Sequence, residues 1–138
     1  MMLCLGACLG AISIVLGALA AHAWKGTLPV EQISMIDTAI RYQQLHCMMV
    51  CFIGGISLMY EKWAQSKLIQ LNNLLFLIGT LLFSFSIYFS ILFEIPWLIK
   101  ITPWGGTTLI LAWLLLAWNG WKDAQVNSTS ILQVTKNI

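Results

Sequence analysis

Charged residues are absent from four long stretches of the chain, residues 1–24, 42–60, 68–93 and 101–121. Leu, Ile, Ala, Met and Phe fill these stretches, and all twelve charged side chains lie between or after them. A helix needs about 20 mostly apolar residues to cross a bilayer, and it satisfies its own backbone hydrogen bonds there. The pattern predicts an all-α, four-transmembrane-helix bundle with spans at about 3–23, 42–60, 71–93 and 104–121.

The connection between the first two spans has a helical pattern of its own. Apolar residues recur in it at helical spacing: Val30, Ile33, Ile36 and Ile40. Thr27 can cap such a helix, and Pro29 suits its first turn because no N–H is needed there. We expect a short amphipathic helix that lies in the membrane interface and leads into the second span. A helix packed across the mouth of the bundle has the same pattern.

Composition agrees with a membrane protein of one domain. Charged residues make up 9% of the 138 residues and hydrophobic residues 59%, with a mean hydropathy of +0.85. An average soluble domain has about 25% charged residues, so a soluble domain, a nucleic-acid binder and a disordered chain are excluded as classes. We expect one membrane domain over 1–121 and a polar, flexible tail over 122–138.

The orientation follows from the basic residues on the two sides of the membrane. An even number of spans puts both termini on the same side. That side carries Lys62, Lys67, Lys122 and Lys136, whereas the other carries Lys25, Arg41 and Lys100. The first side has one more basic residue than the other, which favours cytoplasmic termini. The segment 21–23 resembles a signal-peptidase site, but no basic residue precedes the apolar run, so we expect it to stay as a span.

Small residues form a regular series along the first span, at Gly6, Gly10, Ser13, Gly17 and Ala20. This 3.5-residue seam allows a partner helix to approach closely. The partner is either another helix of the same bundle or a second protein, including a second copy of this chain. Gly54-Gly55 and Gly105-Gly106 are further expected points of close approach.

Polar residues gather at the non-cytoplasmic ends of the predicted spans. They are His22, Arg41, Tyr42, Gln43, His46, Ser84, Tyr88, Glu94 and Thr102. The pairs Tyr42/His46 and Ser84/Tyr88 have the i, i+4 spacing that places side chains on one helix face. Polar groups inside membranes mark functional sites or hydrogen-bond one helix to another. We expect one hydrogen-bonded cluster, either a ligand-binding site or a structural contact.

Candidate cofactor ligands are few. Cys4/Cys8 and Cys47/Cys51 form two i, i+4 pairs, but helical rise puts Cys8 and Cys51 more than about 10 Å apart in depth. A zinc site needs all its ligands within about 2.3 Å of one point. His22 and His46 are expected too close to the membrane surface to act as axial haem ligands. We therefore expect no metal and no cofactor.

Four blocks of sequence resemble the signature of a known family. They are GALAAHA (17–23), TAIRYQQLH (38–46), LFSFSIY (82–88) and ITPWGG (101–106). In this order and spacing they are similar to the YgdD-like family of small inner-membrane proteins of unknown function. The resemblance implies four spans in the bacterial inner membrane, and it supplies no activity. The chain departs from the family pattern at Ala20, Phe85 and Ala112, where the family favours Gly.

The sequence thus predicts a non-enzymatic protein, because no hydrolase, phosphate-binding or zinc-protease motif occurs. The main hypothesis is a structural or partner-binding component of the membrane, with the seam as its contact face. Its partners would be the lipid bilayer and a membrane protein, which can be another copy of itself. The alternative is binding or passage of a small ligand or proton at the polar cluster.

Overall fold

The computed structural model describes residues 1–136, with side chains through residue 125, and is helical throughout apart from short connections. Four long helices are α1 (Met2–Leu19), α2 (Val30–Met59), α4 (Lys67–Thr80) and α6 (Thr102–Lys136). The shorter elements are α3 (Glu61–Gln65), α5 (Ser86–Leu92), the π-helical turns η1 (Ala20–Trp24) and η2 (Leu81–Phe85), and the 3₁₀ helix η3 (Pro96–Ile101). The all-α class is confirmed.

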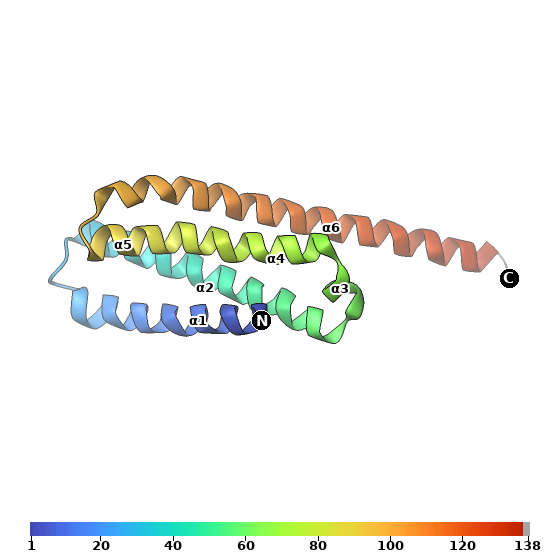
Figure 1. Ribbon diagram of the computed structural model, residues 1–138, viewed down its shortest axis with the longest axis horizontal. Helices are drawn as coiled ribbons and strands as arrows, with labels where there is room; N and C mark the ends of the chain where they lie inside the picture. Colours follow the sequence, from blue (N-terminus) through green and yellow to red (C-terminus); the bar gives the residue numbers. More distant parts are fainter. Residues whose placement is uncertain (137–138) are drawn as a thin grey trace.

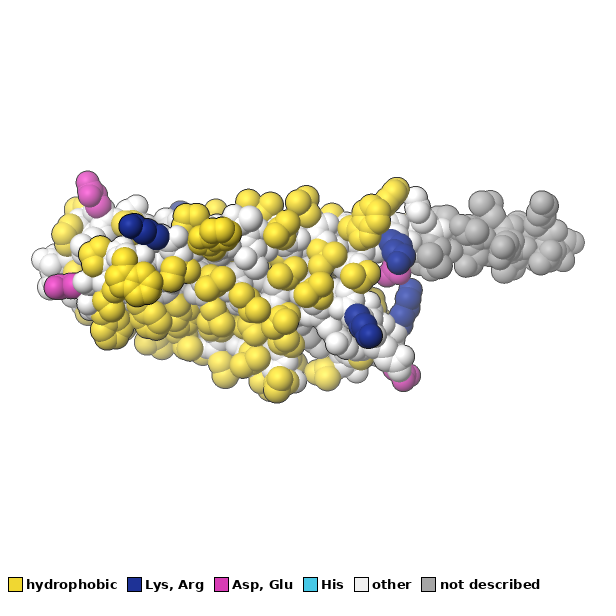
Figure 2. Space-filling model, turned by 45° about the horizontal axis from the view of Figure 1, so that its top comes forward, with side chains coloured by type: hydrophobic (Ala, Val, Ile, Leu, Met, Phe, Trp, Pro, Cys, Tyr) yellow, Lys and Arg dark blue, Asp and Glu magenta, His cyan; other side chains and the backbone are white. Residues whose placement is uncertain are grey.

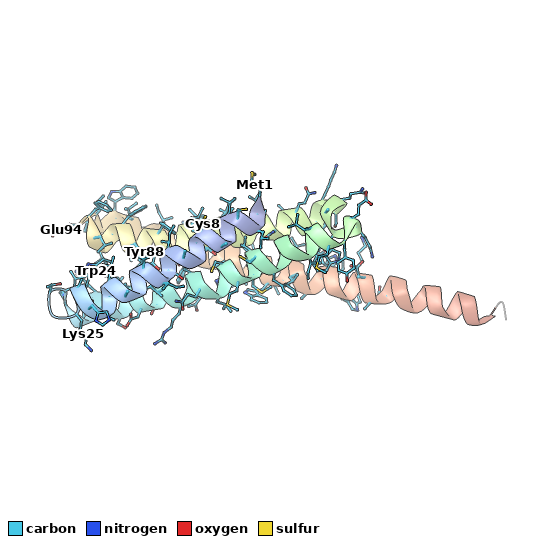
Figure 3. The ribbon with its side chains drawn as sticks, turned by 90° about the horizontal axis from the view of Figure 1, so that it is seen from below. Met1, Cys8, Trp24, Lys25, Tyr88 and Glu94 are labelled. Atoms are coloured by element: carbon cyan, nitrogen blue, oxygen red, sulfur yellow. The ribbon has the colours of Figure 1, made fainter. Side chains whose placement is uncertain are left out.

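The helices lie side by side in an elongated bundle (Figure 1). Helices α4, η2 and α5 follow one another as a single rod, α2 packs against both α1 and α4, and α6 packs against α4 and η2. One end of the bundle holds α3, and we call it the α3 end. The opposite end holds Trp24, Lys25 and Glu94, and we call it the η3 end (Figure 3).

Two apolar clusters form the core. The first, near the η3 end, joins η1, α2 and α5 through Ala20, Ile36 and Tyr88, among others. The second joins α2, α4 and α6 and includes Val50 and Phe76, both fully buried. The outer surface is also apolar: Figure 2 shows hydrophobic side chains in a broad band along the helices, with most of the charged groups toward the two ends. Lipid is the environment in which such a surface is stable.

Among the residues that the structure describes, three helical stretches are long and apolar enough to cross a membrane: Met2–Trp24, Lys67–Leu92 and Pro96–Gln125. They correspond to the first, third and fourth predicted spans. Helix α2, the expected second span, has sufficient length but is less apolar, because Gln43, Gln44 and His46 interrupt its hydrophobic sequence. Most of the predicted polar tail, 126–138, lies outside the residues whose side chains the structure describes.

The short helix expected between the first two spans does form, but it is not an element of its own. Its residues form the first turns of α2, which runs without a break from Val30 to Met59. Ile36 is fully buried and Ile40 nearly so, because this segment packs along the bundle. The expected cap is wrong: Pro29 is the N-cap residue, and the Thr27 hydroxyl donates back to the carbonyl oxygens of Ala23 and Trp24.

The seam of small residues on α1 faces α2 of the same chain. Gly6, Ser13 and Ala20 are buried, whereas Gly10 and Gly17 are half-buried. A Cβ atom added at Gly6 would lie 3.0 Å from the backbone oxygen of Cys47, whereas one added at Gly17 would come no closer than 4.0 Å to a neighbour. The two helices are therefore closest near Gly6, and the seam is occupied inside this chain.

Candidate functional site

The centre of the polar site is the side chain of Gln43, which is fully buried between three helices. Its amide nitrogen donates to the backbone oxygen of Leu9 on α1 at 2.7 Å. Its amide oxygen accepts from the Tyr88 hydroxyl on α5 at 2.8 Å. Gln43 thus links α1, α2 and α5 through two hydrogen bonds, and both ends of its amide have a partner.

Two serines near η2 make further contacts between helices. Ser84 lies in η2, is fully buried and donates to the backbone oxygen of Ala39 on α2 at 2.8 Å. Ser86 and Thr102 share a hydrogen bond of 2.8 Å that joins α5 to the start of α6. π-Helical turns change which residues face a neighbouring helix, and they are frequent at functional sites. Here the π-helical turn η2 contains Ser84 and directly precedes Ser86.

His46 forms a separate group with Tyr42 and Trp113. Its Nδ1 lies 2.7 Å from the backbone oxygen of Tyr42, and its Nε2 accepts from the indole N–H of Trp113 on α6 at 3.2 Å. With Nε2 accepting, Nδ1 carries the proton and the imidazole is neutral. The Tyr42 ring stacks on Phe83 with 4.6 Å between centroids. Both His46 nitrogens are therefore used within the protein.

The remaining predicted members do not join this site. Arg41 is exposed and has no hydrogen bond or ion pair within the described part of the chain. His22 and Glu94 are exposed at the η3 end, where Glu94 occupies a turn with φ +55° (Figure 3). Arg41 is eleven residues, or about 16 Å, along α2 from its start. Because α2 begins so early, the predicted residues lie at different depths, and they form several small groups instead of one cluster.

Four contributors were missing from the prediction: Leu9, Ala39, Ser86 and Trp113. Leu9 and Ala39 contribute backbone oxygens, for which a sequence gives no signal. Trp113 did give a signal, because an indole in the middle of a span needs an acceptor for its N–H. Ser86 lies on the same short segment as Ser84 and Tyr88, but its partner depends on the π-helical turn.

Three buried asparagines form a second polar feature, toward the α3 end. Asn72 donates to the backbone oxygen of Ala112 at 2.6 Å, but its amide oxygen has no partner among the described residues. The amide oxygen of Asn73 and the amide nitrogen of Asn119 are likewise buried without a partner. Unpaired buried polar groups are rare in proteins and call for an explanation.

Two cavities lie between the helices of the described chain. One, of about 350 Å³, is at the α3 end and includes Asn73 in its lining. The other, of about 340 Å³, is near the η3 end, between α1, η1 and the start of α2, and includes Lys25 and Asp37. Neither is lined by Gln43, His46 or Tyr42.

These features define a class, that of small all-helical membrane proteins held together by polar contacts between helices. Residues 16–106 match a family model described as "Protein of unknown function (DUF423)", and the chain belongs to this family. The expected resemblance to YgdD-like proteins is thereby confirmed, as is location in a membrane.

Curated relatives have similar lengths, and their names assign them no activity. A UPF0382 membrane protein of Haemophilus influenzae is 37% identical over 118 residues, which cover 83% of this chain and 88% of the relative. YwdK of Bacillus subtilis, a UPF0382 membrane protein, is 27% identical over 112 residues, or 81% and 89% of the two chains. The UPF0382 inner membrane protein YgdD of Escherichia coli K12 is 28% identical over 115 residues, or 83% and 85%. No solved structure matches the chain.

Proposed function

We propose that this protein is a non-enzymatic structural component of the bacterial inner membrane, a four-span bundle whose polar residues fasten its helices to one another. The observation that carries the proposal is the bonding of Gln43, whose amide is fully buried and has a partner at each end. A group used in this way stabilises the packing of three helices, and its full burial keeps it out of contact with a ligand.

The location of the polar side chains supports α2 as the expected second span, which would make four spans in all. Gln43 and His46 face the interior, at 0% and 2% exposure, whereas Met48 and Phe52 are exposed at 67% and 61%. Between residues 45 and 59 every exposed side chain of α2 is apolar, so this part of the helix would present an apolar surface to lipid. At 30 residues, the helix is about 45 Å long, more than the roughly 30 Å that a hydrocarbon core requires.

The hydrogen bonds of His46 favour the structural role over passage of a proton or ligand. A relay group needs a nitrogen that can exchange protons with water or substrate. Here Trp113 donates to one nitrogen and the other contacts the Tyr42 backbone oxygen. The buried polar groups of Gln43, Ser84 and His46 have partners within the protein, and the two cavities described above are not lined by these residues.

We expect Gln43→Leu and Tyr88→Phe to lower the free energy of unfolding and to leave proton permeability unchanged. Hydrogen bonds between membrane helices contribute about 0.6 kcal/mol on average and up to about 1.7 kcal/mol. A double-mutant cycle in mixed micelles should give a coupling energy in this range. Tyr42→Phe is the control, because the Tyr42 hydroxyl has no partner within the described residues.

The permeability half of this test uses purified protein in vesicles with an imposed pH gradient. The parent and both variants should dissipate the gradient no faster than protein-free vesicles. A flux that depends on His46, measured with His46→Ala, would contradict the structural proposal. A coupling energy of zero would contradict the role of the Gln43–Tyr88 contact.

Both termini are expected to be cytoplasmic. With four spans they share one side, and that side has the larger number of basic residues. In the bundle, α1 begins toward the α3 end and α6 extends past it (Figure 1). A C-terminal alkaline phosphatase fusion should be inactive and a C-terminal green fluorescent protein fusion should fluoresce. The opposite pair of results would reverse the orientation, and a fusion after Gln65 on the other side from the C-terminus would contradict four spans.

A further inference from the structure

One side of α2 stays exposed in the bundle, and its residues recur at alternating spacings of four and three. They are Ser34, Thr38, Arg41, Leu45, Met48 and Phe52, all of them exposed, and we call them the α2 stripe. This alternation is the 3.5-residue pattern by which one helix packs along another. On α1 the same spacing marks the seam that α2 occupies, whereas the α2 stripe remains open in the described part of the chain.

Arg41 lies deep in the apolar part of the bundle. The residue before it, Ile40, packs against α1, since a Cβ atom added at Gly17 would lie 4.0 Å from the Ile40 side chain. Gly17 is seven residues from the end of the apolar stretch Met2–Trp24, so helical rise places Arg41 about 12 Å inside the η3 end of that stretch. An arginine side chain is always charged. A charge at this depth is costly, and such charges mark functional contacts.

The polar groups on this side of α2 lack partners. Asp37 precedes Arg41 by about one helical turn on the exposed side, and Gln44 follows it by about one turn. None of these three side chains has a hydrogen bond or an ion pair within the described residues, where the one ion pair joins Lys62 to Asp123. Ionisable groups inside membranes pair with one another or face water. This side of α2 therefore carries an acid, a base and an amide for which the described chain supplies no partner.

We propose that the α2 stripe is the contact between two copies of this chain, related by a two-fold axis along the membrane normal. This axis makes the two α2 helices parallel. On parallel helices each side chain meets those one turn away on the partner as well as its own equivalent. Arg41 of each copy therefore reaches Asp37 of the other, and the two Gln44 amides bond to each other, since an amide both donates and accepts. The inference rests on the proposal that α2 spans the membrane.

Charge complementarity favours a second copy over a different protein. This side of α2 carries one acid and one base a single turn apart, and the two-fold axis brings both into matching register. The four charges of the contact sum to zero. Leu45, Met48 and Phe52 continue the contact toward the α3 end, with exposures of 50%, 67% and 61%. A different partner would have to place its own acid and base at the same depth.

Energy transfer between copies of the full chain tests whether the dimer forms. Protein labelled at the C-terminus with a donor or an acceptor dye is reconstituted in vesicles of phosphatidylcholine over a range of protein-to-lipid ratios. We expect more transfer than a monomeric membrane protein gives, with the concentration dependence of a dimer. Transfer no greater than that of the monomeric standard at every ratio would overturn the proposal.

Two charge variants, alone and mixed, identify the residues that pair. Asp37→Asn and Arg41→Gln should each dimerise about tenfold more weakly than the parent, which corresponds to the loss of two interhelical contacts of average strength. A mixture of the two variants should dimerise more strongly than either alone, because Arg41 of one chain then meets Asp37 of the other. This rescue also shows that both variants fold.

Two outcomes of this experiment contradict the pairing. A pair within one chain gives no rescue in the mixture, since neither variant has both charges, so absence of rescue would overturn the proposal. Arg41→Gln that dimerises like the parent, as it would if Arg41 instead held a lipid phosphate, would overturn it too.

Two leucines of similar exposure provide a matched control for the position of the contact. Leu45 on the stripe is 50% exposed, and Leu111 on α6, outside the stripe, is 53% exposed. Leu45→Ala should weaken the dimer, whereas Leu111→Ala should dimerise like the parent. Equal effects would place the contact elsewhere. A monomeric protein that keeps the Gln43–Tyr88 coupling energy would overturn the dimer alone and leave the proposed structural role intact.

Discussion

Replacement of Gly105 by alanine is expected to destabilise the bundle by about 3 kcal/mol, near the upper end of the usual cost of overpacking. Gly105 lies in the first turn of α6, where that helix meets η2. A Cβ atom there would overlap the backbone nitrogen of Phe83 and would lie 2.7 Å from its Cα atom. Both neighbours are backbone atoms, so no rotation of a side chain relieves the clash and the two helices must move apart.

Gly120→Ala is the matched control, because it makes the same change in the same helix. No atom lies within 4 Å of the added Cβ at Gly120. Alanine is favoured over glycine in a helix by about 0.5–1 kcal/mol, so this variant should be slightly more stable than the parent. Unfolding by sodium dodecyl sulfate in mixed micelles measures both. If Gly105→Ala unfolds at the same fraction of sodium dodecyl sulfate as the parent, or at a higher one, α6 and η2 are not in backbone contact.

The helical class and the order of the helices were predictable, because both follow from long apolar runs. The residue at which α2 begins could not be predicted. Asp37 and Arg41 interrupt the apolar pattern and suggested that a span starts at residue 42, but both are exposed on the helix. Charges on an exposed face do not end a helix, and no residue between Val30 and Met59 does so. An apolar run marks the hydrophobic limits of a span, which are not the limits of its helix.

The candidate site was only partly predictable for a related reason. Tyr42 and Gln43 are adjacent, so they point about 100° apart on a helix and need not both face the interior. The i, i+4 rule favoured Tyr42 with His46, yet Gln43 is the residue buried among three helices, and Tyr42 is 43% exposed. Which of two neighbouring polar residues faces inward depends on where other helices lie. The positions of the other helices also decide whether the backbone oxygens of Leu9 and Ala39 can accept these hydrogen bonds.

Sequence spacing also could not show which glycines lie closest to a neighbouring helix. Gly54-Gly55 and Gly105-Gly106 look alike in sequence, but only the first member of each pair would place a Cβ atom within 3 Å of another helix. Along α1, Gly6, Gly10 and Gly17 have the same seam position. They differ because the distance between α1 and α2 changes along the helices, which is a property of the crossing geometry.

This difference leads to a graded expectation for the seam. A Cβ atom on Gly6 would lie 2.7 Å from the Cys51 sulfur and 3.0 Å from two backbone atoms of α2, whereas the nearest neighbours are 3.5 Å away at Gly10 and 4.0 Å at Gly17. Alanine at Gly6 should therefore lower the free energy of unfolding by about 1–3 kcal/mol. Alanine at Gly17 should raise it by about 0.5–1 kcal/mol through helix propensity, with Gly10 between them.

Removal of the Cys51 sulfur tests whether the Gly6 contact is the cause. Cys51→Ala should restore part of the stability lost in Gly6→Ala, because the sulfur is the nearest atom, and part of the loss should remain because the two backbone atoms stay at 3.0 Å. No such rescue by a side chain exists for Gly105. Unfolding in mixed micelles gives the four stabilities of the Gly6/Cys51 cycle, and cross-linking in the same micelles reports the oligomeric state. If Gly6→Ala folds as stably as the parent but loses a cross-linked dimer, the seam joins two copies and the contact of α1 with α2 within one chain is wrong.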